Sequence, residues 1–260
     1  MNLQPRVSVL FRLHTLHEYY ESSLNSLLNG SYREIEILIL NTSGSEIPDY
    51  ISSNPRIRII SIPTTNKLGK ILNIGIKESS GNYIAIMDSD DLATANRFDL
   101  QVNIMEQNVD LGFTSSAAII IGIQSIGKLK VNSCLDPVSN NEELWETLLS
   151  RNPIVHSTVM YRKSAILNSN LYYSEKIKVG EDFEFWTRLV GKINYAGIAE
   201  VLVEYRVHGE QTVNTKKLSL QKQVNDTRLK FAIYTFVKKA HLRASAASSI
   251  KHCVKKMLFG

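Results

Sequence analysis

Three carboxylates within four residues form the group in this sequence that is best suited to chemistry. Asp88, Asp90 and Asp91 follow directly after residues 83–87, a short apolar run typical of a buried strand. Acidic side chains this close repel one another unless a positive charge lies among them, and a divalent cation bound through oxygen supplies that charge. Such a cation can in turn hold a phosphate. The alternative is an ordinary turn, rich in Asp and Ser, that closes the strand.

A second acidic pair, Glu181 and Asp182, opens a helix predicted over residues 181–190. The helix dipole and the free amides of a first turn would keep a carboxylate at this position ionised. The alternative is an acidic first turn that only stabilises the helix. Aromatic side chains follow the pair directly and supply packing that would fix its position.

The elements that must position the first group alternate along the chain. The pattern of apolar residues and turns predicts, in order, strand 7–11, helix 17–28, strand 36–40, strand 56–62, helix 68–79 and strand 83–87. Four strands with helical connections favour a mostly parallel, nucleotide-binding sheet, and such sheets bind ligands at the carboxyl ends of their strands. This position favours a cation site at the three acids over a simple turn.

The second half of the chain continues with mixed elements. We expect helix 96–107, strand 112–122, an irregular stretch through 137, helix 140–150, strand 156–161, helix 181–190 and strand 199–207. A linker is predicted near residues 209–215. These patterns divide the chain into a main domain over residues 1–215 and a helical, basic segment over residues 216–260.

The sequence of residues 81–92, Gly-Asn-Tyr-Ile-Ala-Ile-Met-Asp-Ser-Asp-Asp-Leu, followed by Asn96-Arg97-Phe98, resembles the Asp-x-Asp region of the inverting family-2 glycosyltransferases. The resemblance extends over residues 7 to about 215. It implies an α/β architecture of the GT-A type, a Rossmann-like and mostly parallel sheet flanked by helices. It also implies transfer of a sugar from a nucleotide-sugar donor, a UDP-sugar being favoured, with a divalent metal ion (Mn2+ or Mg2+) as cofactor.

The resemblance assigns roles to the acidic residues. In the family the first and third positions of Asp-x-Asp face the ribose and the metal, which here are Asp88 and Asp90, with Ser89 between them on the donor side. The Glu-Asp motif of the family matches Glu181 and Asp182, which makes Asp182 the general base and Glu181 an acceptor-side residue.

Further positions have a structural alternative beside the implied role. His208, in a Tyr-Arg-x-His segment, is a candidate metal ligand or an ordinary surface or core histidine. Lys70 and Asn73 either contact the donor or belong to a solvated helix face. His156 and Trp186 are placed on the acceptor side, His156 as a pocket or structural residue rather than a catalyst.

Two segments depart from the family pattern. Arg12-Leu13-His14-Thr15 stands where the family usually has Pro-Thr-Tyr-Asn, so that His14 is expected to stack on the base and Arg12 to reach a phosphate. Asn41 and Thr42 stand where an Asp-Asp pair usually accepts the imide N–H of the base. An amide or hydroxyl can accept that bond, but it loses charge-assisted strength of about 1 kcal/mol.

The basic character of the chain is concentrated in its last segment. Residues 216–260 hold 11 of the 30 Lys and Arg and one of the 25 Asp and Glu, a net charge of +10, against −5 for the remainder. Apolar residues recur there at helical spacing, so the segment is predicted to form an amphipathic helix that either lies on an anionic membrane surface or packs on the main domain. Nucleic acid is not expected as a partner, because the charge is confined to this segment.

The remaining signals concern location and reaction class. No apolar run approaches the about 20 residues of a membrane helix, so we expect a cytoplasmic protein, peripheral attachment to the inner face of the cell membrane being the alternative. The acceptor is expected to be a glycan or a lipid-linked saccharide in surface polysaccharide biosynthesis. The Gln-x-x-Arg-Trp motif of processive members is not visible, which favours a non-processive enzyme. The alternatives are a nucleotidyltransferase and a non-catalytic, membrane-associated assembly partner.

Overall fold

The computed structural model describes residues 4–63, 65, 67–122, 129–209, 218–236 and 238. Its named elements, in chain order, are β1 (Val7–Leu13), α1 (Tyr20–Leu28), β2 (Ile35–Asn41), α2 (Asp49–Ser52), β3 (Ile57–Ser61), α3 (Leu68–Glu78), β4 (Tyr83–Asp88), β5 (Leu92–Ala93), α4 (Arg97–Gln107), β6 (Leu111–Gly122), β7 (Cys134–Leu135), α5 (Asn141–Leu148), the 3-10 turn η1 (His156–Thr158), β8 (Met160–Arg162), α6 (Lys163–Asn168), α7 (Glu181–Leu189) and β9 (Asn194–Val207). A further helix covers residues 218–236.

Within these described residues the strands form one sheet in the order β3-β2-β1-β4-β8-β6-β9-β5, with β7 paired to β6. The first four strands are parallel to one another. Beyond them β8 runs antiparallel to both β4 and β6, whereas β6 and β9 pair in parallel. The expected α/β sheet is therefore confirmed, and its parallel half is the part that the sequence pattern described best.

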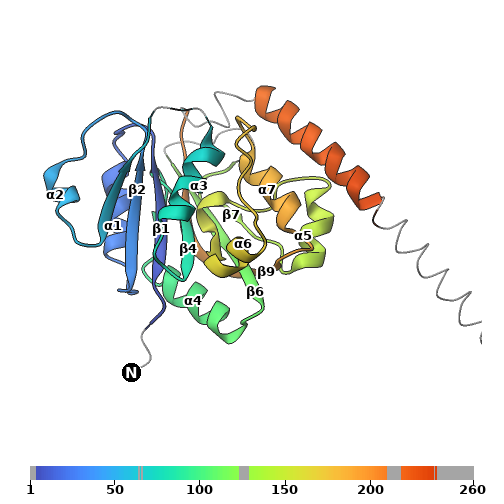
Figure 1. Ribbon diagram of the computed structural model, residues 1–260, viewed down its shortest axis with the longest axis horizontal. Helices are drawn as coiled ribbons and strands as arrows, with labels where there is room; N and C mark the ends of the chain where they lie inside the picture. The colour runs from blue at the N-terminus through green and yellow to red at the C-terminus, as the bar shows by residue number, and fades with distance from the viewer. Residues whose placement is uncertain are drawn as a thin grey trace, which may run out of the picture.

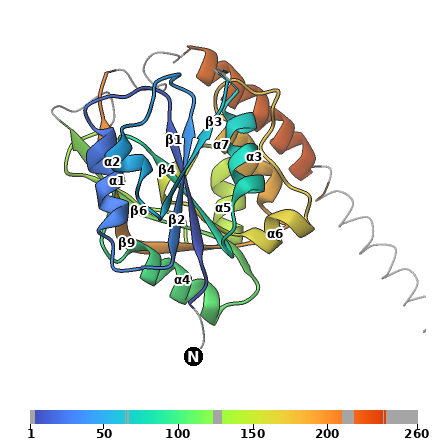
Figure 2. The same cartoon turned by 60° about the vertical axis from the view of Figure 1, so that its left-hand side comes forward.

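Helices cover both faces of the sheet, so its central strands are buried on both sides (Figures 1 and 2). Along β1, Val9 and Phe11 point into a core shared with α1 and α4, and Leu10 points into the opposite core shared with α3, α5 and α7. This alternation follows from the two-residue period of a strand. A strand buried on both faces is apolar along its whole length, and this pattern allowed the central strands to be predicted from the sequence.

The parallel register brings the polar strand ends together. Arg12 on β1 lies beside Leu40 on β2 and beside Asp88 on β4. The next β1 residue, Leu13, lies beside Asn41. The carboxyl ends of three neighbouring strands thus meet at one edge of the sheet, where a ligand site is expected.

The sequence predicted a continuous strand over residues 156–161, but the structure does not show one. Residues His156–Thr158 form the turn η1 and the strand begins at Met160. Hydroxyl groups explain the difference. The Thr158 side chain donates to Val155 O at 2.7 Å, a local bond of the kind that competes with a strand ladder. Ser157 Oγ accepts the amide of Asp88 at the end of β4 at 3.2 Å. The last strand also differs from its prediction, since it begins at Asn194.

The helix over residues 218–236 packs on the main domain. Phe231 on this helix is 4% exposed, and its ring centroid lies 5.2 Å from that of Trp145 on α5. Arg228 lies over the ring of Phe183 on α7 at 5.8 Å. Figure 1 shows the helix running beside α7 and α5. The predicted domain boundary at 215/216 falls outside the described residues.

Candidate active site

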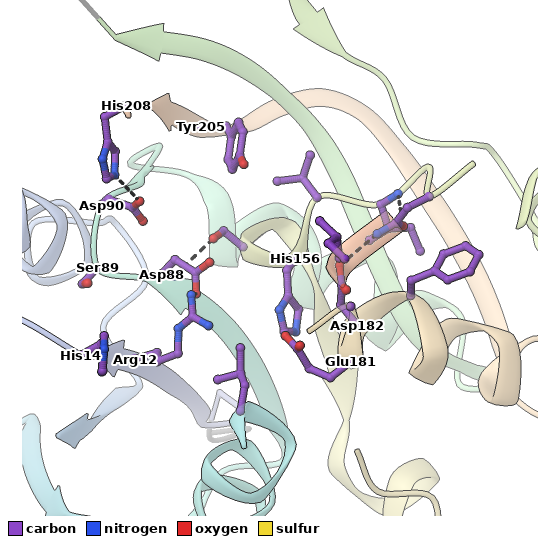
Figure 3. A pocket seen from close by; sticks show the side chains of 18 of the residues that line it. Arg12, His14, Asp88, Ser89, Asp90, His156, Glu181, Asp182, Tyr205 and His208 are labelled. Carbon is purple, nitrogen blue, oxygen red and sulfur yellow. Dashed lines mark hydrogen bonds and ion pairs between the residues drawn. The ribbon is translucent and has the colours of Figure 1, made fainter. Parts of the chain in front are cut away.

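A pocket of about 1460 Å³ opens at the carboxyl ends of β1, β2 and β4. Asp88 and Asp90 line one wall, and Glu181 and Asp182 at the start of α7 line another. Figure 3 shows the two acidic groups on opposite sides, with His156 between them. The two motifs that the sequence places almost a hundred residues apart therefore converge on one cavity.

Arg12 supplies a fixed positive charge within the acidic cluster. Its guanidinium contacts Asp88 Oδ1 at 3.0 Å, and both side chains are largely shielded, at 26% and 21% exposed. Burial by itself lowers the pKa of Arg12, but the carboxylates of Asp88 and Glu181 outweigh it, so the pKa lies above its ordinary value. Strand register dictates this pair, since Arg12 and Asp88 are neighbours across β1 and β4.

Asp90 is held by residues from the end of β9. The imidazole Nε2 of His208 lies 2.9 Å from Asp90 Oδ2, and Arg206 Nε donates to the Asp90 carbonyl at 2.8 Å. The Arg206 guanidinium in turn lies 4.3 Å from the centre of the Tyr19 ring. The Arg206 side chain thus bonds to the backbone of the Asp turn. His208 and Asp90 meet, as the resemblance implied.

Asp91 is fully buried at the base of the cluster. Its Oδ1 accepts the Arg206 amide at 2.9 Å, whereas Oδ2 has no hydrogen-bond partner among the described residues. Burial, followed by repulsion from Asp90 and Asp88, raises the pKa of Asp91 well above its usual range. An unpaired buried carboxylate oxygen is costly, so this atom marks a place where a positive charge would be stabilised.

These residues fit a divalent cation. Asp88, Asp90 and Asp91 each offer a carboxylate oxygen, and the three atoms lie within 4.8 Å of one another. Carboxylate oxygens are the ligands that hard divalent cations prefer.

A buried arginine holds the acidic turn in place from below. Arg97, at the start of α4, donates through Nη2 to Ile86 O on β4 at 3.1 Å and through Nε to Gln101 at 3.1 Å. Burial lowers the pKa of Arg97 to about 9, against the opposing attraction of Asp91. Its hydrogen bond to Ile86 O holds the end of β4, which the acidic cluster follows.

The second acidic pair lies where α7 begins. Gly180 precedes it with φ +74°, a left-handed conformation that glycine adopts without strain. Glu181 is 6% exposed, and burial followed by repulsion from Asp182 raises its pKa to about 7. Asp182 Oδ2 accepts a hydrogen bond from Asn152 Nδ2 at 2.9 Å and lines the cavity. The more open carboxylate of Asp182 is therefore the one placed to meet a substrate.

His156 closes the space between the two acidic walls. Its Nε2 shares a hydrogen bond of 2.8 Å with the Tyr173 hydroxyl, which is bonded to Tyr161 at 2.7 Å. Burial lowers the pKa of His156, against the attraction of Asp182 and Asp88. His156 therefore lines the pocket while its ring is held by a pair of tyrosine hydroxyls.

The residues predicted to contact the nucleotide base differ in whether their side chains are free to bind a ligand. His14 Nδ1 lies 3.3 Å from Thr42 Oγ1, and both residues line the pocket. The Asn41 side chain is occupied by its own turn, because Oδ1 accepts from the amide and hydroxyl of Ser43 and Nδ2 donates to Ser45 O at 2.8 Å. Thr42 thus lines the pocket, whereas Asn41 does not.

Four of the predicted site residues do not line the pocket, and Asn41, whose amide is bonded within its own turn, is one of them. Lys70 is exposed on α3, and the Asn73 amide is bonded to the backbone of Tyr173 at 3.0 and 2.9 Å. Trp186 is fully buried and stacks on Phe113 with 6.1 Å between ring centroids. Asn73 and Trp186 therefore make structural contacts, and Trp186 meets the pocket residue His156 edge-on.

Several lining residues carried no signal in the sequence. His17 lies 2.9 Å from Ser89 Oγ on the donor side. Asn152 and Lys178 line the acceptor side, and so do Leu220 and Val224 of the last described helix. Isolated polar residues in loops have no periodicity, so only the folded chain shows that they meet. Across the part of the chain that the structure describes, no helix is both long and apolar enough to cross a bilayer.

Comparison with known proteins shows the family of this chain. Residues 12–168 match the family model of glycosyl transferase family 2. The chain is 28% identical over 217 residues to an uncharacterized glycosyltransferase of Haemophilus influenzae, covering 80% of this chain and 67% of that protein. It is 26% identical to the O-antigen biosynthesis glycosyltransferase WbnJ of Escherichia coli, covering 79% of this chain and 81% of WbnJ.

A solved structure shows the same fold. The crystal structure of S. aureus TarS residues 1–349 in complex with UDP-GlcNAc superposes with a TM-score of 0.62 at 16% identity, covering 79% of this chain and 60% of that one. The chain spans 31% of a further relative, an uncharacterized glycosyltransferase of Rickettsia bellii. Because the family match covers more than half of the chain and the fold agrees with it, the protein belongs to glycosyl transferase family 2 and has the GT-A fold.

Proposed function

We propose that this glycosyltransferase is metal-dependent, inverting and non-processive, and that it moves a sugar from a UDP-sugar to a hydroxyl group of a glycan or lipid-linked acceptor in polysaccharide biosynthesis. One observation carries the proposal: Asp90 and Asp182 line opposite walls of one pocket. The UDP-GlcNAc in the TarS complex and the polysaccharide roles in the names of WbnJ and of AmsE of Erwinia amylovora support the donor and the pathway.

Asp182 acts as the general base. Its carboxylate takes the proton of the acceptor hydroxyl as that oxygen forms a bond to the anomeric carbon, while the bond from this carbon to the diphosphate oxygen breaks on the opposite side. The electron pair leaves with the nucleoside diphosphate. In-line attack of this kind inverts the anomeric configuration, and Asn152 orients the base through its 2.9 Å bond.

The donor wall stabilises the leaving group. Asp88, Asp90, Asp91 and His208 would hold the divalent cation, which when bound supplies positive charge to the diphosphate. Arg12 keeps Asp88 in place and offers the donor a second positive charge that is always present. His14 and Thr42 form the side of the pocket available to the base.

Thermal unfolding with a panel of nucleotide sugars tests the donor and the metal together. At ligand concentrations about 100-fold above Kd, a UDP-sugar with Mn2+ is expected to raise Tm by about 5–10 °C. Asp90→Asn is expected to abolish the Mn2+-dependent part of the shift. Asp110→Asn is the matched control, because Asp110 is exposed and lies outside the pocket.

The same material separates the alternatives. If no nucleotide sugar shifts Tm with or without Mn2+, the proposal fails and a non-catalytic assembly partner is favoured, in line with the occupied Asn41 amide. Labelled nucleotide on the product would instead indicate a nucleotidyltransferase. For the transfer reaction, the anomeric configuration of the product by NMR tests inversion, and addition of one sugar per acceptor by mass spectrometry tests non-processivity.

A further inference from the structure

The helix over residues 218–236 has an inner face that belongs to the pocket. Leu220 and Val224 line the cavity, and Phe231 and Thr235 are buried, at 4% and 6% exposed. Phe231 packs on Trp145 of α5. This face alone accounts for the attachment of the helix to the main domain.

The outer face of the same helix is apolar over its last two turns. Leu218, Leu229, Ile233 and Phe236 are 85%, 62%, 57% and 76% exposed. With 3.6 residues per turn these positions fall on one stripe, on the side of the helix away from Phe231. Between Leu218 and Leu229 the same side carries the exposed polar residues Lys222, Asn225 and Asp226, so the apolar patch is formed by Leu229, Ile233 and Phe236. An exposed apolar patch of this kind marks an interaction site.

Basic residues accompany this stripe. Lys222 lies on the same side of the helix and Lys230 at its edge, and both are exposed. The sequence from 216 to 260 carries a net charge of +10. A second copy of the chain would bring two such charges together, which is unfavourable. An anionic lipid bilayer offers negative headgroups for the lysines and an apolar interior for the stripe, so it fits both properties.

We propose that the outer face of the helix over residues 218–236 binds an anionic membrane surface, with Leu229, Ile233 and Phe236 inserted among the lipids and Lys222 and Lys230 at the headgroups. The inner face of this helix lines the pocket near Asp182. Membrane binding therefore places the acceptor side of the pocket at the bilayer. Together with the proposed function, on which this step rests, the position indicates an acceptor carried by a membrane lipid.

Cosedimentation of the full chain with vesicles tests the proposal. Vesicles of phosphatidylcholine with about 30 mol% phosphatidylglycerol are compared with phosphatidylcholine alone. The chain is expected to bind the anionic vesicles, and the triple variant Leu229→Gln, Ile233→Gln, Phe236→Gln is expected to bind at least about tenfold more weakly. Val109→Gln, at a site 73% exposed and far from this helix in the chain, is expected to bind like the unmodified protein.

Other measurements keep the outcomes distinct. Far-UV circular dichroism confirms that the variants are folded. The proposal is overturned if the unmodified chain does not bind anionic vesicles, or if the triple variant binds them as tightly as the unmodified chain. It is also overturned if light scattering shows that the unmodified chain is a dimer and the triple variant a monomer, with no vesicle binding by either. Calorimetric titration with UDP-GlcNAc and Mn2+ is expected to be the same for the triple variant and the unmodified chain. If neither the triple variant nor the unmodified chain binds the nucleotide sugar, the proposed function is contradicted. The membrane proposal is decided separately, by the vesicle result alone.

Discussion

The two walls of the pocket are built in different ways. The donor wall is formed by consecutive positions at the ends of neighbouring parallel strands, and its acids are bonded to Arg12 and His208. The acceptor wall joins a helix N-terminus, a loop and a later helix, and Asp182 on it is bonded to the neutral Asn152. The proposed function assigns the two walls different tasks, since the donor wall would stabilise the leaving diphosphate and the acceptor wall would take up a proton.

Replacing the base is expected to have the largest effect. Asp182→Asn keeps the shape and the contact region of Asn152 but removes the proton acceptor, so the transfer rate should fall about 10²–10⁴-fold. Binding of donor and Mn2+ should be unchanged, since those groups lie on the other wall. Initial rates with donor titrations measure both. Equal losses of rate and donor affinity would contradict the division between the walls.

The acceptor wall should also give the protein a pH-dependent stability. Glu181 has its pKa raised to about 7 by burial and by Asp182. Between about pH 4.5 and 7 the folded state thus binds more protons than the unfolded state, and stability falls as the pH rises through this window. Glu181→Gln should remove a slope of up to about 1.4 kcal/mol per pH unit. Urea unfolding at a series of pH values measures it.

A matched control separates this effect from general titration. Glu200 on β9 is exposed, so Glu200→Gln should leave the dependence on pH as it is. A Glu181→Gln variant whose unfolding free energy declines with pH as steeply as that of the unmodified protein would show that another group causes the decline.

The sequence predicted the acidic motifs better than the single polar residues around them, for a physical reason. A buried strand followed by Asp88, Asp90 and Asp91 is a local pattern, and parallel register then dictates which strand ends meet. The contacts of an isolated polar residue depend instead on packing between distant segments. Asn73, predicted as a donor contact, illustrates this limit, because its amide is bonded to the backbone of Tyr173, a hundred residues later, and helical periodicity does not predict such a bond.

The turn at η1 and the residue pair at the base side show the same limit at short range. The apolar pattern around residues 156–161 favours a strand, but the Thr158 hydroxyl bonds to the backbone of Val155 and the chain turns before Met160. Asn41 occupies the position expected for a base contact, yet its own turn uses both ends of the amide. Polar side chains with several possible partners are the ones whose roles the sequence leaves open.

The smallest expected effect concerns the charge balance of the donor wall. Arg12→Met removes the partner of Asp88 in a largely shielded pair, so the free energy of unfolding should fall by about 1–3 kcal/mol. Mn2+ should restore part of it, because the cation replaces the lost positive charge among the acids. Arg58→Met is the control, since the Arg58–Glu78 pair is 48% and 52% exposed and should contribute less than about 1 kcal/mol. If Mn2+ does not restore any of the lost stability, Arg12 stabilises the fold through packing. The difference in charge between the two walls would then not depend on Arg12.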